Sequence, residues 1–407
     1  MANKYQNNVF EQYQNYDTFI FDFDGTLFDT DNANYLAYCK AVYDVVGIHI
    51  KFTHSRTTRE TIKNNYPKIT DEQMKEIINK KEIYFNDFMK DIFIIRPMID
   101  ILFEAKERHK KIILLTNASK KRVMDIIDYF DKNYRFSKKI KDCFANNPTY
   151  YKNDINCNDK YEFLFKKENI TDFNKVVIFE DDIKFRKSLI QNGYPKSQIF
   201  PDIFIKYFEI QENDFLKKKS WAYFHEHYSS YRNKGNPDYI CVLKNDYKDI
   251  SKNNLEIAQK QLLQILLKEF SLLLKVHNFD MICMVPRAKK DTYYEDNQLL
   301  IRETVSKATQ KLLINDGTHY ITRIKNTNTT HKKEKEFDDP YPGITENTCK
   351  ISDDINGKII LLVDDIYTET INIDEDAIQA LLNKGAKQVI FYAIARTINK
   401  KYSNEAK

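Results

Sequence analysis

A short apolar run at residues 19–21 leads directly into Asp22 and Asp24, and Gly25 follows at once. Such a run predicts a buried strand. The chain curls at the carboxyl end of a parallel strand, so both carboxylates can reach one crevice, and the glycine permits the tight turn that this requires. Two carboxylates at a strand end suit an oxygen-liganded divalent cation, a nucleophile and a proton-transfer group. This stretch therefore predicts an α/β fold with catalytic chemistry at the end of its first strand.

The block Asp22-Phe23-Asp24-Gly25-Thr26 resembles the first motif of the haloacid dehalogenase-like (HAD) phosphohydrolases. The resemblance implies that Asp22 is the nucleophile and that Asp24 is the general acid/base. It also implies a Mg²⁺ cofactor, with Asp22, Asp24 and Asp181 as the metal ligands. The alternative for this block is an acidic surface turn.

Composition and length limit the possible functions. A chain of 407 residues favours two or three domains. No apolar run approaches the roughly 18 residues that a membrane span needs, and the first residues lack an apolar signal region. The six cysteines occur singly, without the spacing of a zinc site or a disulfide framework, and the net charge of +5 is too small to argue for nucleic-acid binding. We therefore expect a cytoplasmic enzyme with no membrane or nucleic-acid partner.

Residues 31–95 read as an insert of helices, one from residue 31 and another from about residue 70 to residue 92. On its own this pattern indicates an ordinary helical subdomain. In a HAD-like phosphohydrolase, an insert at this point implies a helical cap that excludes water and selects the substrate.

Two further apolar runs end in polar groups. The first, at residues 110–115, leads into Thr116 and Asn117; a hydroxyl here often caps a helix, but it is also where a phosphate is held. By resemblance to the second HAD motif, Thr116 is catalytic and Asn117 binds substrate. The second run ends in Glu180, Asp181 and Asp182, and three successive acids repel one another unless a cation neutralises them. We expect Asp181 to bind the metal, with Glu180 or Asp182 in support; a solvated acidic turn is the alternative.

The resemblance also requires a lysine between these two runs, which offsets the charge of the aspartate and the phosphoryl group. Lys160, at the start of an expected helix, is our assignment, and Lys152 is the alternative. The proline that usually follows this lysine in the family is missing here.

We place the HAD-like domain at residues 1–210, a polar and aromatic linker at 211–236, and a second domain at 237–407. His225 and His227 fall in the linker. Because no carboxylate partner for them is evident in the sequence, we interpret this pair as structural.

The second domain is expected to begin with a strand at residues 239–243 and an amphipathic helix around residues 255–273. An apolar strand at residues 279–286 then leads into a basic loop with Arg287 and Lys289. Such a loop could bind pyrophosphate, although most basic loops are simply solvated.

Another apolar strand ends in Asp364 and Asp365. After it come a turn, a helix, a glycine and one more strand, at residues 366–372, 375–383, 385 and 387–396. This order resembles the diphosphoribose-binding unit of the type I phosphoribosyltransferases, nearest to their competence-protein group. The resemblance implies that Asp364 and Asp365 hold the ribose hydroxyls and that the turn binds the 5′-phosphate of phosphoribosyl diphosphate (PRPP) or a nucleotide. The donors in that turn are Thr368, Thr370 and Asn372.

One feature of this region departs from the family motif, and a second feature has two possible interpretations. Family members usually carry Thr-Thr-Gly-x-Thr where this chain has Thr368-Glu369-Thr370-Ile371-Asn372, so a glycine is lost and a negative charge is added. The polar stretch at residues 323–345 corresponds in position to the mobile loop that closes over substrate. Its alternative is a solvent-exposed charge run.

The sequence thus predicts two Rossmann-like parallel-sheet domains, a capped HAD core and a type I phosphoribosyltransferase fold. The expected function is bifunctional: a Mg²⁺-dependent phosphatase acting on a small-molecule phosphate ester, and phosphoribosyl transfer from or to PRPP in nucleotide or nucleoside-like metabolism. A homo-oligomer is compatible with this. In the alternative, the second domain is a degenerate PRPP- or nucleotide-binding regulatory module. A scaffold with both sites inactive is disfavoured, because all four acids at the strand ends are present.

Overall fold

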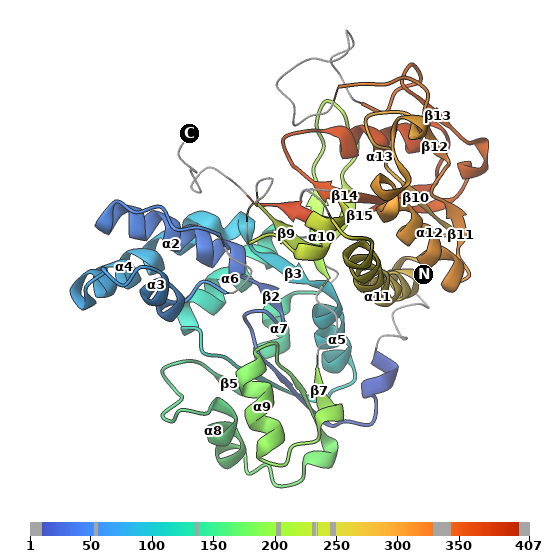
Figure 1. The fold of residues 1–407 in the computed structure, drawn as a ribbon. Coiled ribbons are helices and arrows are strands. Elements are labelled where there is room, and N and C mark those ends of the chain that lie inside the picture. Colours follow the sequence, from blue (N-terminus) through green and yellow to red (C-terminus); the bar gives the residue numbers. More distant parts are fainter. Residues whose placement is uncertain are drawn as a thin grey trace. The chain divides into compact units, whose positions relative to one another are not determined.

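The computed structural model describes residues 10–52, 56–134, 138–200, 205–229, 233, 235–244, 250–328 and 343–398. The chain divides into two compact units (Figure 1). Unit 1 comprises Met1–Lys51, Ser55–Lys206 and Asn399–Lys407, and unit 2 comprises Phe52–His54 and Tyr207–Ile398. Each unit has its own parallel strands and its own buried core.

The central sheet of unit 1 has the strand order β5-β4-β1-β6-β7, and all of its pairs are parallel. Its strands are β1 (Thr18–Phe21), β4 (Lys111–Leu115), β5 (Thr149–Tyr150), β6 (Val176–Phe179) and β7 (Ile199–Phe200). From β1 the chain adds β4 and β5 on one side, and later β6 and β7 on the other. The strand order therefore reverses between β1 and β6, and this is where open α/β sheets bind their ligands.

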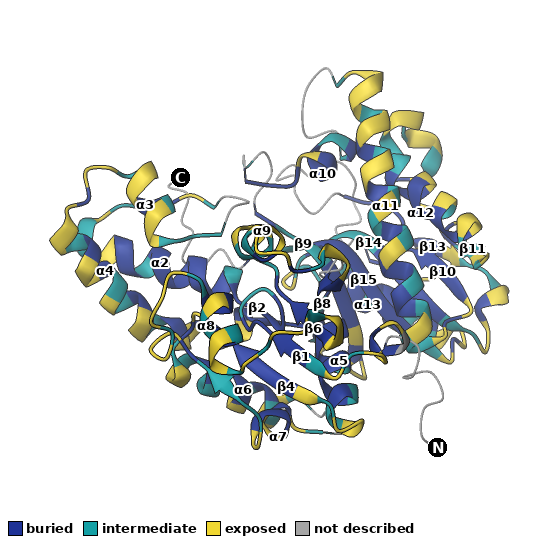
Figure 2. Cartoon of the chain, turned by 90° about the horizontal axis from the view of Figure 1, so that it is seen from below, coloured by how far each residue is buried: buried dark blue, intermediate teal, exposed yellow. Residues whose placement is uncertain are grey.

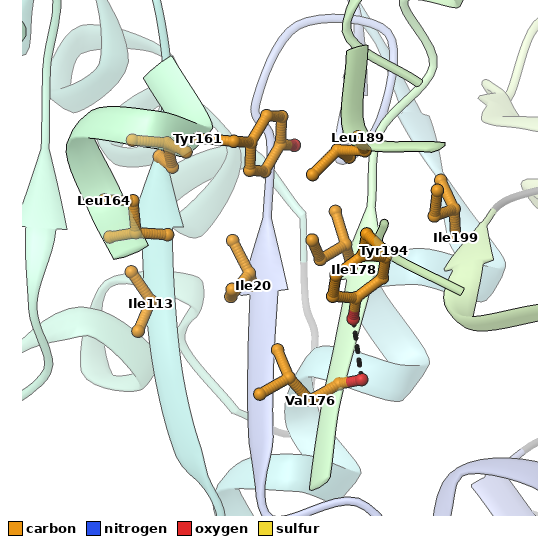
Figure 3. Close-up of a cluster of buried hydrophobic side chains, with 10 residues drawn as sticks. Ile20, Ile113, Tyr161, Leu164, Val176, Ile178, Leu189, Tyr194 and Ile199 are labelled. Carbon is orange, nitrogen blue, oxygen red and sulfur yellow. Dashed lines mark hydrogen bonds between the residues drawn. The ribbon is translucent and has the colours of Figure 1, made fainter. Parts of the chain in front are cut away.

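The strands of this sheet are buried on both faces, which explains why they read as continuous apolar runs. On one face, Ile20 lies in register with Ile113 of β4 and Ile178 of β6. Tyr161 and neighbouring apolar side chains cover these isoleucines, as Figure 3 shows. On the sheet itself the rings of Phe21 and Phe179 stack with centroids 4.6 Å apart.

The helices beside this sheet are α5 (Arg96–Glu107), α6 (Lys120–Asn133), α7 (Ile140–Phe144), α8 (Lys160–Lys167) and α9 (Ile183–Gln191). Side chains of the preceding residues begin several of them. The Ser119, Asp159 and Asp182 side chains accept backbone N–H groups at the starts of α6, α8 and α9. Short 3-10 helices of unit 1 are η1 (Glu11–Tyr13), η2 (Phe85–Asp91), η3 (Phe173–Lys175) and η4 (Lys196–Gln198).

A helical insert separates β1 from α5. The antiparallel pair β2 (Phe28–Asp29) and β3 (Phe93–Ile95) brackets it. Between them lie α2 (Asp31–Val46), α3 (Arg59–Asn65), α4 (Asp71–Tyr84) and η2. Capping boxes at Thr58 and Thr70 begin α3 and α4. In Figure 2 these two helices carry many exposed residues, whereas the strands of the central sheet are buried.

The strands of unit 2 follow the order β11-β10-β14-β15-β9-β8. Their bounds are β8 (Lys206–Ile210), β9 (Ser220–Tyr228), β10 (Met281–Met284), β11 (Asn315–Gly317), β14 (Ile359–Tyr367) and β15 (Gln388–Thr397). The pairs from β11 to β9 are all parallel. The chain runs from β10 to β11 in one direction and from β14 to β15 in the other, so the order reverses between β10 and β14.

The helices of unit 2 are α10 (Asp238–Leu243), α11 (Lys252–His277), α12 (Leu300–Lys311) and α13 (Ile373–Asn383). A small antiparallel pair, β12 (Ile321–Arg323) and β13 (Cys349–Ile351), flanks residues 329–342, the part of the expected 323–345 loop that lies outside the described residues. The short 3-10 helices are η5 (Asp291–Tyr293), η6 (Asp296–Gln298) and η7 (Asp353–Ile355).

Two local expectations differ from the structure. The run expected as a strand at residues 239–243 is the helix α10, because a short buried apolar run has no periodicity that separates the two, and Pro237 suits the position before a helix. Residues 220–228, expected in the linker, form β9, which pairs with β15. The lysines at 217–219 made this segment look like a linker, yet Tyr223 and Phe224 are fully buried.

Candidate active site

Asp22 follows β1 directly, and its backbone N–H donates to the Phe179 carbonyl at 2.9 Å. Its side chain is buried. Lys160, the first residue of α8, lies 2.7 Å from Asp22 Oδ1 and 2.7 Å from Glu180 Oε2 through its Nζ atom. Lys160 is only 2% exposed. The structure thus places a buried ammonium between two buried carboxylates at the reversal point of the sheet.

The charges of this cluster shift the ionisation of its members. Burial raises the pKa of Asp22 to about 7, although the ammonium of Lys160 acts in the opposite direction. Burial opposes the charged form of Lys160 too, but Asp22 and Glu180 raise the pKa of this lysine above its ordinary value. Burial and the nearby Asp22 raise the pKa of Asp181 well above its usual range. One lysine therefore does not balance the three carboxylates.

Asp22, Glu180 and Asp181 each offer an oxygen atom, and these atoms all lie within 4.8 Å of one another. The oxygen-only donor set and its excess negative charge fit a hard divalent cation such as Mg²⁺. Gly25 has φ +82°, and a Cβ atom there would lie 2.0 Å from Asp181 Oδ2. The glycine therefore provides both the turn and the space for Asp181, whose Oδ1 also accepts from the Thr26 hydroxyl at 3.2 Å.

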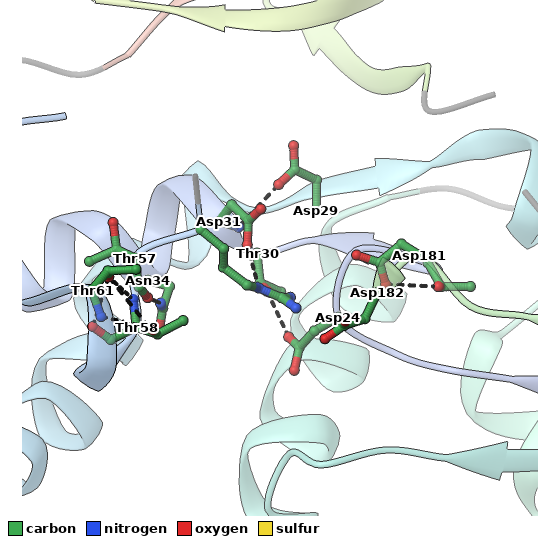
Figure 4. A network of polar contacts seen from close by, with 12 residues as sticks. Asp24, Asp29, Thr30, Asp31, Asn34, Thr57, Thr58, Thr61, Asp181 and Asp182 are labelled. Carbon is green, nitrogen blue, oxygen red and sulfur yellow. Dashed lines mark hydrogen bonds and ion pairs between the residues drawn. The ribbon is translucent and has the colours of Figure 1, made fainter. Parts of the chain in front are cut away.

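Asp24, the third expected metal ligand, is not one of these three residues. Its Oδ1 accepts from the Thr30 hydroxyl at 2.6 Å and from Arg122 Nη2 at 2.9 Å; Figure 4 shows the contact with Thr30. Burial favours the protonated form of Asp24, but Arg122 and Arg56 lower the pKa of this carboxyl below its ordinary value. Asp24 is thus held ionised, apart from the Asp22 cluster.

The helical insert contributes charge to this region. Arg56 Nε donates to Asp31 Oδ1 at 2.8 Å, and its guanidinium partly opposes the rise in the pKa of Asp181 that burial and Asp22 cause. Arg122, from α6, stacks on the ring of Phe85, with Cζ 4.1 Å from the ring centroid. Two arginines from outside the strands, Arg56 and Arg122, therefore act on Asp24, and Phe85 contacts the second of them. No sequence motif pointed to Arg56 or Arg122, because their partners are distant in the chain.

The structure separates the two lysine candidates and the remaining expected residues. Lys152 is exposed, and its backbone N–H donates to the Ala118 carbonyl at 3.0 Å. Thr116 is buried at the same sheet edge as Asp22, and its Oγ1 accepts from the Ala118 N–H at 3.0 Å. Asn117 is exposed, and Asp182 caps α9 instead of joining the acidic cluster. Lys160 alone of the two lysines contacts Asp22 among the described residues.

Unit 2 contains a pocket of about 190 Å³ at the carboxyl ends of β10 and β14, where its strand order reverses. Lys244, Arg287, Asp364, Asp365, Thr368 and Asp374 are among the residues that line it. Lys244 forms an ion pair with Asp365. Burial opposes ionisation of Asp365, yet Lys244 lowers the pKa of this carboxyl, whereas burial and Asp365 raise the pKa of Asp364 to about 7. The two acids thus differ in how strongly they hold a proton.

Three residues expected at this pocket, Lys289, Thr370 and Asn372, do not belong to its described lining. Lys289 is buried and Thr370 is exposed. Asn372 takes the left-handed conformation, with φ 56°, before α13, and its Oδ1 accepts from Asn213 Nδ2 at 3.2 Å. The positive φ therefore falls at Asn372 and not at Thr370, where the family has glycine.

His225 has a carboxylate partner that the sequence did not indicate. Its Nδ1 lies 2.6 Å from Oε1 of Glu269 on α11, and the Tyr392 hydroxyl donates to Glu269 Oε2, also at 2.6 Å. Glu269 is buried. The pair joins β9, α11 and β15, which agrees with a structural role for His225.

Comparisons with known proteins identify part of the chain. Residues 16–185 match the haloacid dehalogenase-like hydrolase family. This match includes the Asp22, Lys160 and Glu180–Asp181 positions, and the comparison with curated proteins gave no match.

Solved structures similar to this chain include a hydrolase from Pseudomonas syringae, with 17% identity, 43% of this chain and 81% of that chain covered, and a TM-score of 0.33. CbbY from Rhodobacter sphaeroides in complex with phosphate has 15% identity, 44% and 83% coverage, and a TM-score of 0.33. A HAD-superfamily hydrolase from Geobacter sulfurreducens has 16% identity, 44% and 85% coverage, and a TM-score of 0.33. Similarities this low carry no argument about function.

The family match ends within α9 and does not cover residues 186–407. Among the described residues, no helix has the length and apolar character to span a membrane. The chain therefore contains a haloacid dehalogenase-like hydrolase domain at residues 16–185.

Proposed function

We propose that unit 1 is a phosphatase that works through an aspartyl-phosphate on Asp22. The observation that carries this proposal is the buried Asp22–Lys160 pair, which lies beside the Glu180–Asp181 carboxylates at the reversal point of the sheet. The family match supports hydrolase chemistry at this place in the chain. The substrate class is a small-molecule phosphate ester.

In the first step, an Asp22 oxygen attacks phosphorus, the bond from phosphorus to the ester oxygen breaks, and Asp24 gives its proton to that oxygen. In the second step, Asp24 takes a proton from water, and the water oxygen attacks phosphorus to release phosphate and free Asp22. Because Arg122 holds Asp24 ionised, the described arrangement suits the second step. Before the first step Asp24 has to bind a proton, which its contact with Arg122 opposes.

Lys160 balances the charge of Asp22 and of the transferred phosphoryl group, and Thr116 with nearby backbone amides holds the phosphoryl oxygens. Asp22, Glu180 and Asp181 are the residues that would hold Mg²⁺. When bound, that ion supplies charge neutralisation between these carboxylates and the phosphate. Asp24, expected as a ligand from the sequence, acts through proton transfer in this proposal.

The test is hydrolysis of a generic aryl phosphate with Mg²⁺ by the full chain and by Asp22→Asn. We expect the variant to lose about a thousandfold or more of kcat, because an amide cannot form the covalent intermediate. Asp182→Asn, which changes a helix-capping acid near the cluster, is the matched control and should keep most of the activity. An active Asp22→Asn would exclude this mechanism.

We also propose that unit 2 binds a phosphorylated ribosyl compound. The observation that favours it is a pocket at the reversal point of the sheet with arginines and paired carboxylates in its lining. Asp364 and Asp365 would accept hydrogen bonds from ribose hydroxyls, and Arg287 would bind a phosphate. Two versions follow, phosphoribosyl transfer from PRPP or regulatory binding without reaction. Glu369 and the loss of the turn glycine favour the second.

Calorimetric titration with PRPP, with and without a panel of nitrogenous bases, separates these versions. Heat of binding with no release of pyrophosphate indicates a regulatory site, and base-dependent release indicates transfer. In both versions, Asp365→Asn should lower the affinity for the ribosyl ligand by about tenfold, because a charge-assisted hydrogen bond to a ribose hydroxyl is lost. If neither PRPP nor any ribose phosphate binds, the proposal for unit 2 fails.

A further inference from the structure

The pocket of unit 2 has arginines on one side and carboxylates on the other, and Lys244, which pairs with Asp365, is a cation on the carboxylate side. Its arginines belong to the side of β10: Arg287 follows that strand, and Arg302 lies on α12, which connects β10 to β11. Its carboxylates belong to the side of β14: Asp364 and Asp365 lie on that strand, and Asp374 lies on α13, which connects β14 to β15. Because β10 and β14 are neighbours in the sheet, the two groups line one pocket from adjacent strands.

Contacts between the loops hold the cationic side in place. Arg323 is 4% exposed, and its Nε donates to the Arg287 carbonyl at 3.1 Å. Arg287 Nη1 donates to the Gln298 carbonyl at 2.6 Å, and its guanidinium lies 4.5 Å from the centroid of the Tyr294 ring. Arg302 pairs with Asp291 at 2.5 Å, and that acid is not in the described lining of the pocket. This side is therefore a preorganised site for an anionic group.

The opposite side is unsuited to an anion. A helix N-terminus usually attracts phosphate, but the first turn of α13 contains Asp374, Glu375 and Asp376. Asp374 lines the pocket and is 5% exposed. Its Oδ1 atom has no hydrogen-bond partner among the described residues. A buried carboxylate oxygen without a donor favours a ligand that brings one, such as a hydroxyl group.

Two groups of the turn before α13 are already hydrogen-bonded within the protein. The Thr368 hydroxyl bonds to the Thr397 hydroxyl at 2.7 Å, and the Ile371 N–H donates to the Thr368 carbonyl at 3.0 Å. Glu369 pairs with Arg396 at 3.1 Å and is itself 76% exposed through its side chain. A phosphate at this turn would compete with existing hydrogen bonds and meet several carboxylates.

We propose that the unit 2 pocket takes a ribosyl compound with a single anionic group, which lies against the arginines while neutral hydroxyl groups lie against Asp364, Asp365 and Asp374. A second phosphate at the opposite end of the sugar is excluded. This inference rests on the proposed ribosyl binding by unit 2 and names the class of ligand: a pentose monophosphate or a nucleoside monophosphate, not a pentose phosphorylated at both ends. Because PRPP is phosphorylated at both ends, the inference selects the regulatory version of the unit 2 proposal over transfer from PRPP.

The test is calorimetric titration of the full chain carrying Asp22→Asn, which prevents hydrolysis of the ligands by unit 1. The ligands are ribose 1-phosphate, ribose 5-phosphate and ribose 1,5-bisphosphate, each at constant Mg²⁺. We expect the tighter of the two monophosphates to bind about tenfold or more tightly than the bisphosphate. A bisphosphate that binds more tightly than both monophosphates overturns the inference and leaves ribosyl binding intact. If none of the three ligands binds, ribosyl binding by unit 2 fails as well.

Variants on each side of the pocket locate the effect. Arg287→Met should weaken monophosphate binding by about tenfold, whereas Lys290→Met, an exposed cation of the same loop outside the described lining, should change it by less than about twofold.

Asp374→Asn should raise the affinity for the bisphosphate by about fivefold, because the amide offers a hydrogen-bond donor to the second phosphate where the carboxyl oxygen Oδ1 is an acceptor without a partner. Glu303→Gln on α12, which pairs with Lys307 away from the pocket, is the control for that change. An unchanged bisphosphate affinity in Asp374→Asn contradicts the assigned role of this side.

Discussion

Two lysines of one short segment, Lys152 and Lys160, have opposite environments in unit 1. Lys160 is buried against Asp22 and Glu180, whereas Lys152 is exposed. Removing a buried ammonium group leaves two buried carboxylates without their partner, and this lowers the stability of the fold. Removing a solvated lysine changes the stability little. The burial of the side chain therefore distinguishes the two candidates where their positions in the sequence did not.

We predict that Lys160→Met lowers phosphatase kcat/KM by about a hundredfold or more, since the charge beside the transferred phosphoryl group is lost. Lys152→Met should stay within about threefold of the parent. Steady-state kinetics with an aryl phosphate measure both, and circular dichroism checks that Lys160→Met is folded. Equal losses in the two variants would refute the assignment of Lys160.

Arg122 is a positioning residue for Asp24, because its guanidinium contacts the Asp24 carboxylate at 2.9 Å. The guanidinium also lies over the ring of Phe85, and this contact orients Arg122. We predict that Arg122→Met lowers kcat by about ten- to a hundredfold with little change in KM, since Asp24 loses its orientation. Arg122→Lys should recover part of the loss. Lys121→Met, an exposed neighbour on α6, serves as the control. A change confined to KM would indicate substrate binding by Arg122 instead.

At the scale of the element, the first turn of α13 gathers three acidic residues, Asp374, Glu375 and Asp376. Burial raises the pKa of Asp374 well above its ordinary value, and the neighbouring Asp364 adds to the rise. The pKa of Asp364 itself is about 7. A carboxyl group whose pKa is higher in the folded state binds more protons there than in the unfolded chain. Stability is therefore lost as the pH rises from about 4 to about 7.

We predict that Asp374→Asn raises the unfolding free energy of unit 2 by about 1–3 kcal/mol at a pH of about 8, because it removes one member of the repelling pair. The gain should vanish at about pH 2 to 3, below the pKa of about 3.9 that an aspartate has in the unfolded chain, where both carboxyl groups are protonated in the folded and unfolded states. Denaturant unfolding at the two pH values measures the difference. A variant destabilised equally at both would show that Asp374 acts through packing.

Helices and strands were predictable to different degrees. The strands β1, β4, β6 and β14 were evident, because parallel strands buried on both faces are continuous apolar runs. The helix α11 was evident from its helical spacing of apolar residues. By contrast, α10 was expected as a strand and β9 as part of a linker, because a short run carries no usable period and β9 is defined by its pairing with β15.

At the scale of the whole molecule, two units with separate cores predict two unfolding transitions. Mg²⁺ binding to Asp22, Glu180 and Asp181 should stabilise unit 1 alone and so raise its unfolding temperature. At a Mg²⁺ concentration one hundred times the Kd, the unfolding free energy of unit 1 should increase by about 2.7 kcal/mol. Differential scanning calorimetry with and without Mg²⁺ measures this. In Asp181→Asn the shift should disappear, while the transition of unit 2 stays in place. A shift of both transitions in the parent would point to a second binding place.

By itself, the sequence determined which strands are buried and which acids stand at their ends, since apolar runs and glycine turns are local features of the chain. It also determined the resemblance of Asp22, Thr116 and Asp181 to HAD motifs, and residues 16–185 match that family. Only the tertiary structure decided which charges meet: Lys160 with Asp22, Arg122 with Asp24, and Asp374 beside Asp364. Charge pairing depends on burial and distance across the fold, and neither follows from separation along the chain.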